Sequence, residues 1–249
     1  MKRKTVNVII SLVGVFLVWE IAAVLLNRYF LPTPFKTFAT MNELLAGHEI
    51  WMHIGTSFKR IALGTLLGLG CALPLGIVMG RYPAVDGVLG AFFRLIYPIP
   101  KVVFMPIVVV MLGIGDTAKI FLIFLAVFFQ ITIIIRDSAA SLDPELSDVM
   151  RSMKAGHLQV LRHLILPGCL PGNLTALKSS LGTSVALLMI TEVFASTSGL
   201  GYFIMNSMDA RNYPEMYAGI VILALMSALM YAFIEVLENV LCRWHYTRQ

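Results

Sequence analysis

Long apolar runs alternate with short polar breaks along most of the chain, and this pattern predicts membrane-spanning helices. A run of roughly 20 apolar residues matches the thickness of a bilayer core, and backbone groups inside lipid must be paired within helices. We therefore expect an all-α polytopic membrane protein with about six spans, in a single transmembrane domain over residues 1–249. The predicted spans are residues 6–26, 54–79, 85–112, 118–135, 174–195 and 216–241.

Composition and charge agree with that pattern. Hydrophobic residues make up 58% of the chain and charged residues 13%, and the mean hydropathy is +0.84, which excludes an ordinary soluble domain. The net charge of +5 comes from basic residues scattered at the ends of apolar runs, so it indicates topology rather than nucleic-acid binding. Lys2, Arg3 and Lys4 predict a cytoplasmic N-terminus, and the basic ending RWHYTRQ predicts a cytoplasmic C-terminus. The first apolar run is too long for a cleaved signal peptide and should remain as a span.

Glycine and proline distinguish the second and third spans from the others. Gly64, Gly68, Gly70 and Gly76 predict that the second span packs closely against other helices. Three prolines in YPIPKVVFMPIVVVMLGIG, at residues 98–106, predict a bent or broken third span. Such a break either lines a substrate path or is a simple kink between packed helices.

The longest polar-rich segment covers residues 143–171, and its residues 143–167 predict a helical hairpin between the fourth and fifth spans. Asp143 and Pro144 form a strong helix start, and the break at Ala155-Gly156 separates two short helices. Pro167 should end the second helix. The apolar side chains of the first helix recur at helical spacing and predict a docking face: Leu146, Val149, Met150 and Met153. That face rests either on the cytoplasmic lipid surface or on a protein partner.

The same segment resembles the cytoplasmic loop of permease subunits of binding-protein-dependent ABC importers. That loop reads Glu-Ala-Ala, three residues, Gly, nine residues, then Ile-x-Leu-Pro. Asp148, Val149 and Met150 stand at its start, and residues 164–167 match its ending. Lys154 stands at the glycine, with Gly156 as a possible substitute. The segments TSFKRIALG, PIPKVVFMPIVVVMLGIGDTAKI and EVFASTSGLGYFI are similar to the nitrate, sulfonate and taurine branch of the family.

The resemblance implies the transmembrane subunit of a type I importer in the bacterial inner membrane. Its partners would be two ATPase subunits, a second permease protomer, most simply an identical copy, and an external solute-binding protein. ATP and Mg would be bound by the ATPase, since this chain has no G-x-x-x-x-G-K-[ST] phosphate loop. The substrate would be a small anion such as a sulfonate, taurine or nitrate, or else a vitamin or vitamin precursor. The implied ATPase-coupling residues are Asp148, Val149, Met150, Met153, Lys154, Ala155, Gly156 and Leu158.

Polar residues inside the spans are the candidates for a substrate path or gate. Glu192 is costly in lipid, so we expect it to make a structural hydrogen bond, to act in a gate, or to lie at the interface. Gln130, Ser184 and Thr191 either line a pore or bond across helices. Arg94, Lys101 and Lys119 are cations that could attract an anion.

The sequence shows no pattern typical of a catalytic site or a metal site. The three cysteines are far apart, and the five histidines have no metal-ligand spacing, so we expect no disulfide, metal or catalytic group. Two other classes remain as alternatives. A membrane-embedded enzyme would need ionisable residues that converge, and an autonomous carrier would transport without ATP.

Overall fold

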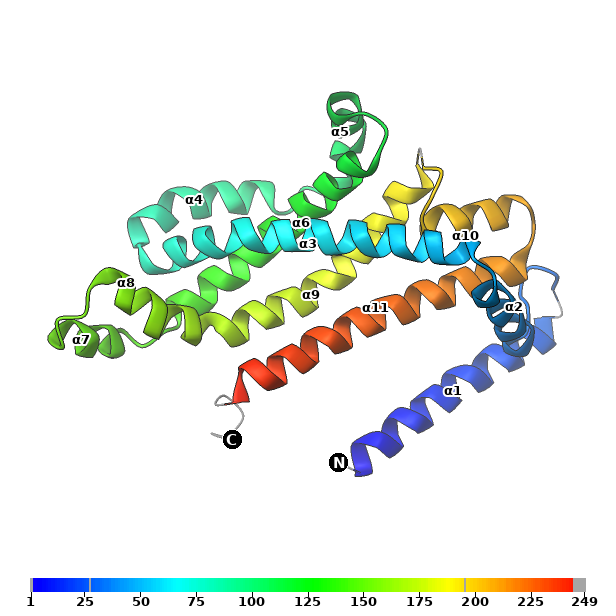
Figure 1. Ribbon diagram of the computed structural model, residues 1–249, viewed down its shortest axis with the longest axis horizontal. Coiled ribbons are helices and arrows are strands. Elements are labelled where there is room, and N and C mark those ends of the chain that lie inside the picture. Colours follow the sequence, from blue (N-terminus) through cyan, green and yellow to red (C-terminus); the bar gives the residue numbers. More distant parts are fainter. Residues whose placement is uncertain (1, 27, 195, 244–249) are drawn as a thin grey trace. The chain divides into compact units, whose positions relative to one another are not determined.

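The computed structural model describes residues 2–26, 28–194 and 196–243, and these residues form helices joined by turns, without a strand (Figure 1). Their contacts divide the chain into two compact units. The first unit is Met1–Ser57 with Thr197–Met226, and the second is Phe58–Ser196 with Ser227–Gln249. The helices are α1 (Lys2–Leu26), α2 (Pro34–Ala46), α3 (Glu49–Arg81), α4 (Pro83–Ile96), α5 (Met105–Leu112), α6 (Asp116–Ala140), α7 (Pro144–Ser152), α8 (His157–Val160), α9 (Leu166–Val193), α10 (Leu200–Asp209) and α11 (Tyr213–Leu241).

Four helices in the described part of the chain are long and apolar enough to cross a membrane. They are α3, α6, α11 and the continuous helix His157–Val193, and α4 with α5 makes a fifth if that bent pair crosses once. Among the residues of α1 whose side chains are described, Val13–Leu26 is apolar. The all-helical polytopic fold is therefore confirmed, while the count of six spans and the single domain over residues 1–249 stay predictions.

A stripe of small residues on α3 packs against α6 in the second unit. The stripe recurs every fourth residue: Gly64, Gly68, Ala72, Gly76 and Gly80. A Cβ atom added at Gly64 would lie 2.6 Å from the Ile123 side chain, and one added at Gly76 would lie 2.8 Å from Ile135 and 2.9 Å from the Thr132 carbonyl oxygen. The predicted close packing is thus present at Gly64, Gly68 and Gly76. A Cβ atom added at Gly70 would meet nothing within 4 Å, so Gly70 does not share in the contact.

The third span is broken, as its prolines predicted. α4 and the segment Lys101–Leu112 meet at an angle of 81°, with Tyr97–Pro100 between them. Lys101 lies at the break, 8% exposed, and its Nζ donates to the carbonyl oxygens of Ile96, Tyr97 and Ile99 at 2.6, 3.2 and 2.8 Å. The ammonium also lies 4.9 Å from the centre of the Phe129 ring. Lys101 therefore satisfies the carbonyl groups that the end of α4 leaves without helical partners.

The prediction that Pro167 ends the second hairpin helix was wrong. α8 continues through a π-helical turn at Leu161–Ile165 into α9, so that His157–Val193 is one helix of 37 residues. Proline cannot donate a backbone hydrogen bond, and its ring crowds the carbonyl group four residues earlier. The helix absorbs this by widening, and the Leu166 amide donates to the Leu161 carbonyl five residues back. The fifth apolar span consequently begins well before residue 174.

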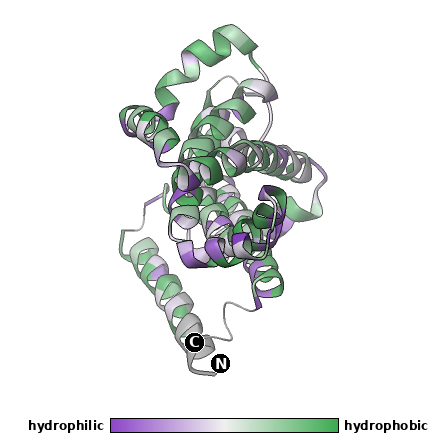
Figure 2. Ribbon diagram, turned by 90° about the vertical axis from the view of Figure 1, so that its left-hand side faces the viewer, coloured by the Kyte–Doolittle hydropathy of each residue, from purple (hydrophilic) through white to green (hydrophobic). Residues whose placement is uncertain are grey.

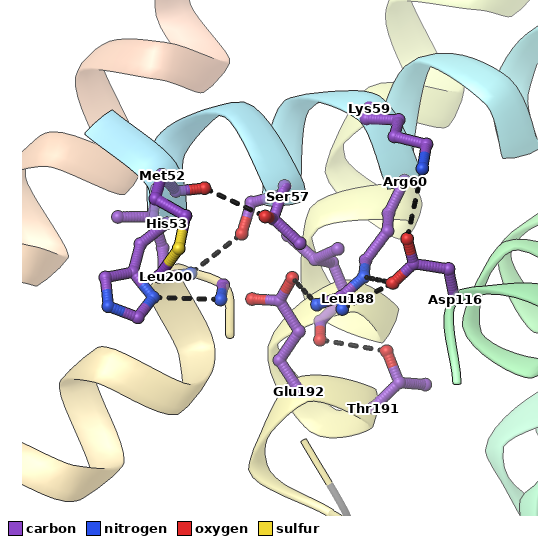
Figure 3. A network of polar contacts seen from close by, with 12 residues as sticks. Met52, His53, Ser57, Lys59, Arg60, Asp116, Leu188, Thr191, Glu192 and Leu200 are labelled. Carbon is purple, nitrogen blue, oxygen red and sulfur yellow. Dashed lines mark hydrogen bonds and ion pairs between the residues drawn. The ribbon is translucent and has the colours of Figure 1, made fainter. Parts of the chain in front are cut away.

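In the first unit, side chains of α3 cap the start of α10. The cap residue Gly199 has no side chain to offer, and its amide donates to Nδ1 of His53 at 3.0 Å. The Leu200 amide donates to Oγ of Ser57 at 2.8 Å (Figure 3). Both acceptors are buried, so the first amides of α10 are paired across the unit rather than locally.

Candidate functional site

The hairpin begins as its sequence predicted. The Asp143 carboxylate accepts a hydrogen bond from the Glu145 amide at 2.9 Å, and Pro144 takes the first helical position of α7. In Figure 2 the α7–α8 end of the second unit faces the viewer, and hydrophilic residues gather there among mainly hydrophobic helices. The hairpin is therefore a polar, locally capped element at one end of apolar helices.

The end of α7 explains the glycine in the family loop. Lys154 has φ of +60°, its amide donates to the Arg151 carbonyl at 2.8 Å, and the Ala155 amide reaches back to the Met150 carbonyl at 3.0 Å. These two bonds form a Schellman motif, whose first residue beyond the helix needs a left-handed backbone. Gly156 has φ of −72° and is not the substitute. Lys154 thus occupies the position where glycine would be least strained.

Replacing Lys154 with glycine should therefore stabilise the protein. Left-handed backbone costs a residue with a side chain roughly 1–2 kcal/mol, so we expect a gain of about 1 kcal/mol after the added chain flexibility of glycine is subtracted. Gly156→Ala is the matched control: the weaker N-cap preference of alanine and the lower flexibility of the unfolded chain offset each other, so stability should change by less than about 0.5 kcal/mol. Thermal unfolding of the purified chain in detergent measures both, and a destabilised Lys154→Gly variant would contradict the assigned turn.

An apolar row on the hairpin has no cover within the described part of this chain. Met153 and Leu158 are 76% and 75% exposed, and Leu146 and Val149 are about half exposed. Met150 is half-buried, and Asp148, Lys154 and Gly156 are exposed. Large apolar side chains exposed together on a polar segment mark a surface that contacts something else.

Two contacts hold the hairpin to the long helices of its unit. Nη2 of Arg81, the last residue of α3, donates to Oγ of the buried Ser147 at 2.6 Å. On the other side α8 runs directly into α9. A displacement of the hairpin would thus be passed to α3 and α9 at once.

A buried ion cluster joins three helices of the same unit (Figure 3). Arg60 of α3 is 3% exposed and lies between two carboxylates: Nη1 is 2.7 Å from Glu192 of α9, and Nη2 is 2.6 Å from Asp116 at the start of α6. Glu192 has no exposed surface. Lys59, which is exposed to solvent, adds a second contact to Asp116, with its Nζ 3.2 Å from the carboxylate. The interfacial alternative for Glu192 does not fit this burial. Arg60 was missed as its partner, although the sequence places it in the TSFKRIALG segment.

The four residues predicted for a path or gate do not converge on one site. Gln130 is half-buried, accepts from Thr183 at 2.9 Å, and lines a cavity of about 310 Å³ together with Thr183 and Lys101. Ser184 is buried and lies 3.1 Å from the Thr65 hydroxyl. Thr191 is buried and donates to the Leu188 carbonyl at 3.0 Å. Of the four, Gln130 is therefore the residue that faces this cavity.

The predicted cations have separate environments, and an ion pair between α9 and α11 was not anticipated. Arg94 is exposed, whereas Lys119 is 5% exposed and interacts electrostatically with the Arg60 cluster. Lys178 of α9 pairs with Glu238 of α11, and Glu238 is buried. Among the described residues no group of three or more His, Cys, Asp or Glu side chains could hold a metal ion.

Comparison with known proteins shows which family the chain belongs to. Residues 72–244 match the family described as the inner membrane component of binding-protein-dependent transport systems. The chain belongs to this family. The taurine transport system permease protein TauC of Escherichia coli K12 is 31% identical over 234 residues, which cover 91% of this chain and 85% of TauC. The putative aliphatic sulfonates transport permease protein SsuC of Bacillus subtilis 168 is 31% identical over 229 residues, 91% of this chain and 83% of SsuC.

Solved structures show the same fold. A chain of the MetNI methionine ABC transporter in an inward-facing conformation matches with a TM-score of 0.67 at 18% identity, over 77% of this chain and 97% of that chain. By the family match and the relatives at 31% identity, this permease is the transmembrane subunit of an ABC importer and a multi-pass inner-membrane protein. Membership of the family implies ATPase and binding-protein partners.

Proposed function

We propose that this permease imports a small anion of the sulfonate, taurine or nitrate type, driven by ATP hydrolysis on a separate subunit. The substrate class is supported by the similarity to taurine and sulfonate permeases over nearly the whole chain. Two copies of this chain, two ATPase subunits carrying ATP and Mg, and an external binding protein make up the working importer. Both termini and the hairpin lie on the cytoplasmic side.

The α7–α8 hairpin is the element that docks onto the ATPase. The observation that carries this proposal is the uncovered apolar row, with Met153 and Leu158 each about three-quarters exposed. The row lies on a hairpin that is hydrogen-bonded to α3 through Arg81 and continuous with α9. ATP-driven movement of the ATPase pair would therefore tilt both long helices and open the path alternately to either side.

The solute path follows the face that carries Gln130. The Gln130–Thr183 pair lines a cavity of about 310 Å³ beside the break between α4 and α5, where irregular backbone is tolerated because it borders a cavity. The amide of Gln130 has donors for an anionic oxygen. Glu192, held by Arg60, orders the helices around the path without touching the solute.

Replacing Met153 with aspartate tests the docking. A carboxylate placed in an apolar interface must be desolvated at a cost of several kcal/mol, so ATPase co-purification should fall by at least about ten-fold. Ser152→Asp adds the same charge at an exposed polar position next to Met153 that does not belong to the apolar row, and it should retain the ATPase. Full ATPase retention by Met153→Asp would mean that the apolar row rests on lipid instead.

A further inference from the structure

A cavity of about 500 Å³ lies between the end of α3 and the hairpin, and Leu158 of the apolar row is among the residues that line it. One wall is apolar and consists of Ile77 and Val78 from the last turns of α3 with Leu161 and Ile165 from the π-helical turn. The remaining lining includes the polar residues Arg81, Tyr82, Arg151 and His157. The cavity therefore has a cationic rim and an apolar wall.

The residues that line this cavity include cations and no carboxylate. Arg81 donates to the neutral Ser147 hydroxyl, a contact that brings no negative charge to the guanidinium. Arg151 lies 3.7 Å from Asp148, but both side chains are about three-quarters exposed, and such a surface pair is weak. Two guanidinium groups, with further N–H and O–H donors beside them, suit a phosphate group.

The cavity lies where one candidate membrane span ends and another begins. Arg81 is the last residue of α3 and His157 the first residue of His157–Val193, and both helices are long and apolar enough to span the membrane. Ile77 and Val78 precede Arg81 by about one turn, on the hydrocarbon side of it. Arginine at the end of an apolar span usually lies at the bilayer surface, so we expect Arg81 to lie there and Ile77 and Val78 to lie beside the acyl chains.

The π-helical turn contributes directly to the wall. Leu161 and Ile165 are its first and last residues, and both line the cavity. A π turn places an extra residue in the helix, and such turns are found frequently at functional sites.

We infer that this cavity binds an anionic phospholipid, with its phosphate between Arg81 and Arg151 and the start of an acyl chain against Ile77 and Val78. The phosphate would bridge α3 to α7, next to the Arg81–Ser147 hydrogen bond. The lipid then fixes the hairpin at the angle from which it meets its partner. This inference rests on the proposed membrane position of α3 and α9, and its test does not require the ATPase.

Lipid retention by the full-length chain tests the site. The chain is reconstituted in phosphatidylcholine vesicles with a minor share of phosphatidylglycerol and extracted in mild detergent, and the retained phosphatidylglycerol is counted by native mass spectrometry. One cation near a lipid surface corresponds to about a five-fold change in binding, so Arg151→Gln should retain about five-fold less phosphatidylglycerol. Phosphatidylcholine retention should not change.

Two controls distinguish loss of this site from a general loss of positive charge and from a loosened hairpin. Arg162→Gln removes an exposed cation from the same end of the unit, outside the cavity, and should retain as much lipid as the unaltered chain. Ser147→Ala breaks the Arg81 hydrogen bond but keeps both arginines of the cavity, so this variant should also retain as much phosphatidylglycerol as the unaltered chain. Equal losses in Arg151→Gln and Arg162→Gln, or full displacement of the lipid by millimolar inorganic phosphate, would overturn the proposal.

Discussion

Replacing Arg60 with leucine is expected to remove most of the folded permease from the membrane. The change deprives Glu192, which has no exposed surface, of its partner 2.7 Å away, and it removes two hydrogen bonds to Asp116. Breaking a buried ion pair by deleting one partner costs about 3–5 kcal/mol, a large part of the stability of a typical domain. The midpoint of thermal unfolding in detergent should fall sharply.

Two further variants show whether the loss of stability comes from the broken Arg60–Glu192 pair or from the loss of a positive charge in general. Arg60→Leu combined with Glu192→Leu should recover much of the stability, because two apolar side chains can replace a buried pair at little cost. Lys59→Leu removes the exposed member of the cluster and should cost no more than about 1 kcal/mol. If the double variant unfolds as readily as Arg60→Leu, the pairing of Arg60 with Glu192 is not what holds α3 to α9.

Gly76→Val should separate α3 from α6. The added side chain would meet the Ile135 Cβ and the Thr132 carbonyl oxygen below 3.0 Å, and neither atom belongs to the free end of a flexible side chain. Overpacking of this kind typically costs about 1–3 kcal/mol, and more where backbone must move. We expect a lower unfolding temperature and poor accumulation in the membrane.

Gly70→Val is the matched control for that change. It makes the same substitution in the same helix at a position with nothing within 4 Å, so it should leave stability nearly unchanged. Because both variants alter helix propensity equally, the difference between them measures the contact with α6 alone. Equal effects of the two substitutions would contradict the small-residue stripe as the packing surface.

The sequence predicted the features that depend on neighbouring residues: the start of α7, the broken third span and the close packing of α3. Asp143 and Pro144 predicted the start of α7 because capping needs only neighbouring residues. The prolines after Tyr97 predicted the broken span, and the glycines at residues 64, 68 and 76 predicted close helix packing. The family resemblance also placed a glycine where the backbone of Lys154 is left-handed.

The sequence did not predict which residues far apart in the chain form ion pairs. Arg60 and Glu192 are 132 residues apart, and no periodicity in either helix says which cation a buried carboxylate will meet. Pro167 misled because its usual effect is to end a helix, whereas this helix continues past it through a π turn. Ser184 and Thr191 were candidates because they are polar, yet their hydroxyls are bonded to neighbouring groups inside the unit.

Uptake of taurine by proteoliposomes tests the importer assignment most directly. Vesicles are prepared with this permease alone and with its ATPase and binding protein, and accumulation is followed with and without ATP on the ATPase side. We predict accumulation only when ATP and both partners are present, and its loss in the Met153→Asp variant but not in Ser152→Asp. Accumulation by the permease alone without ATP would contradict an ATP-driven importer.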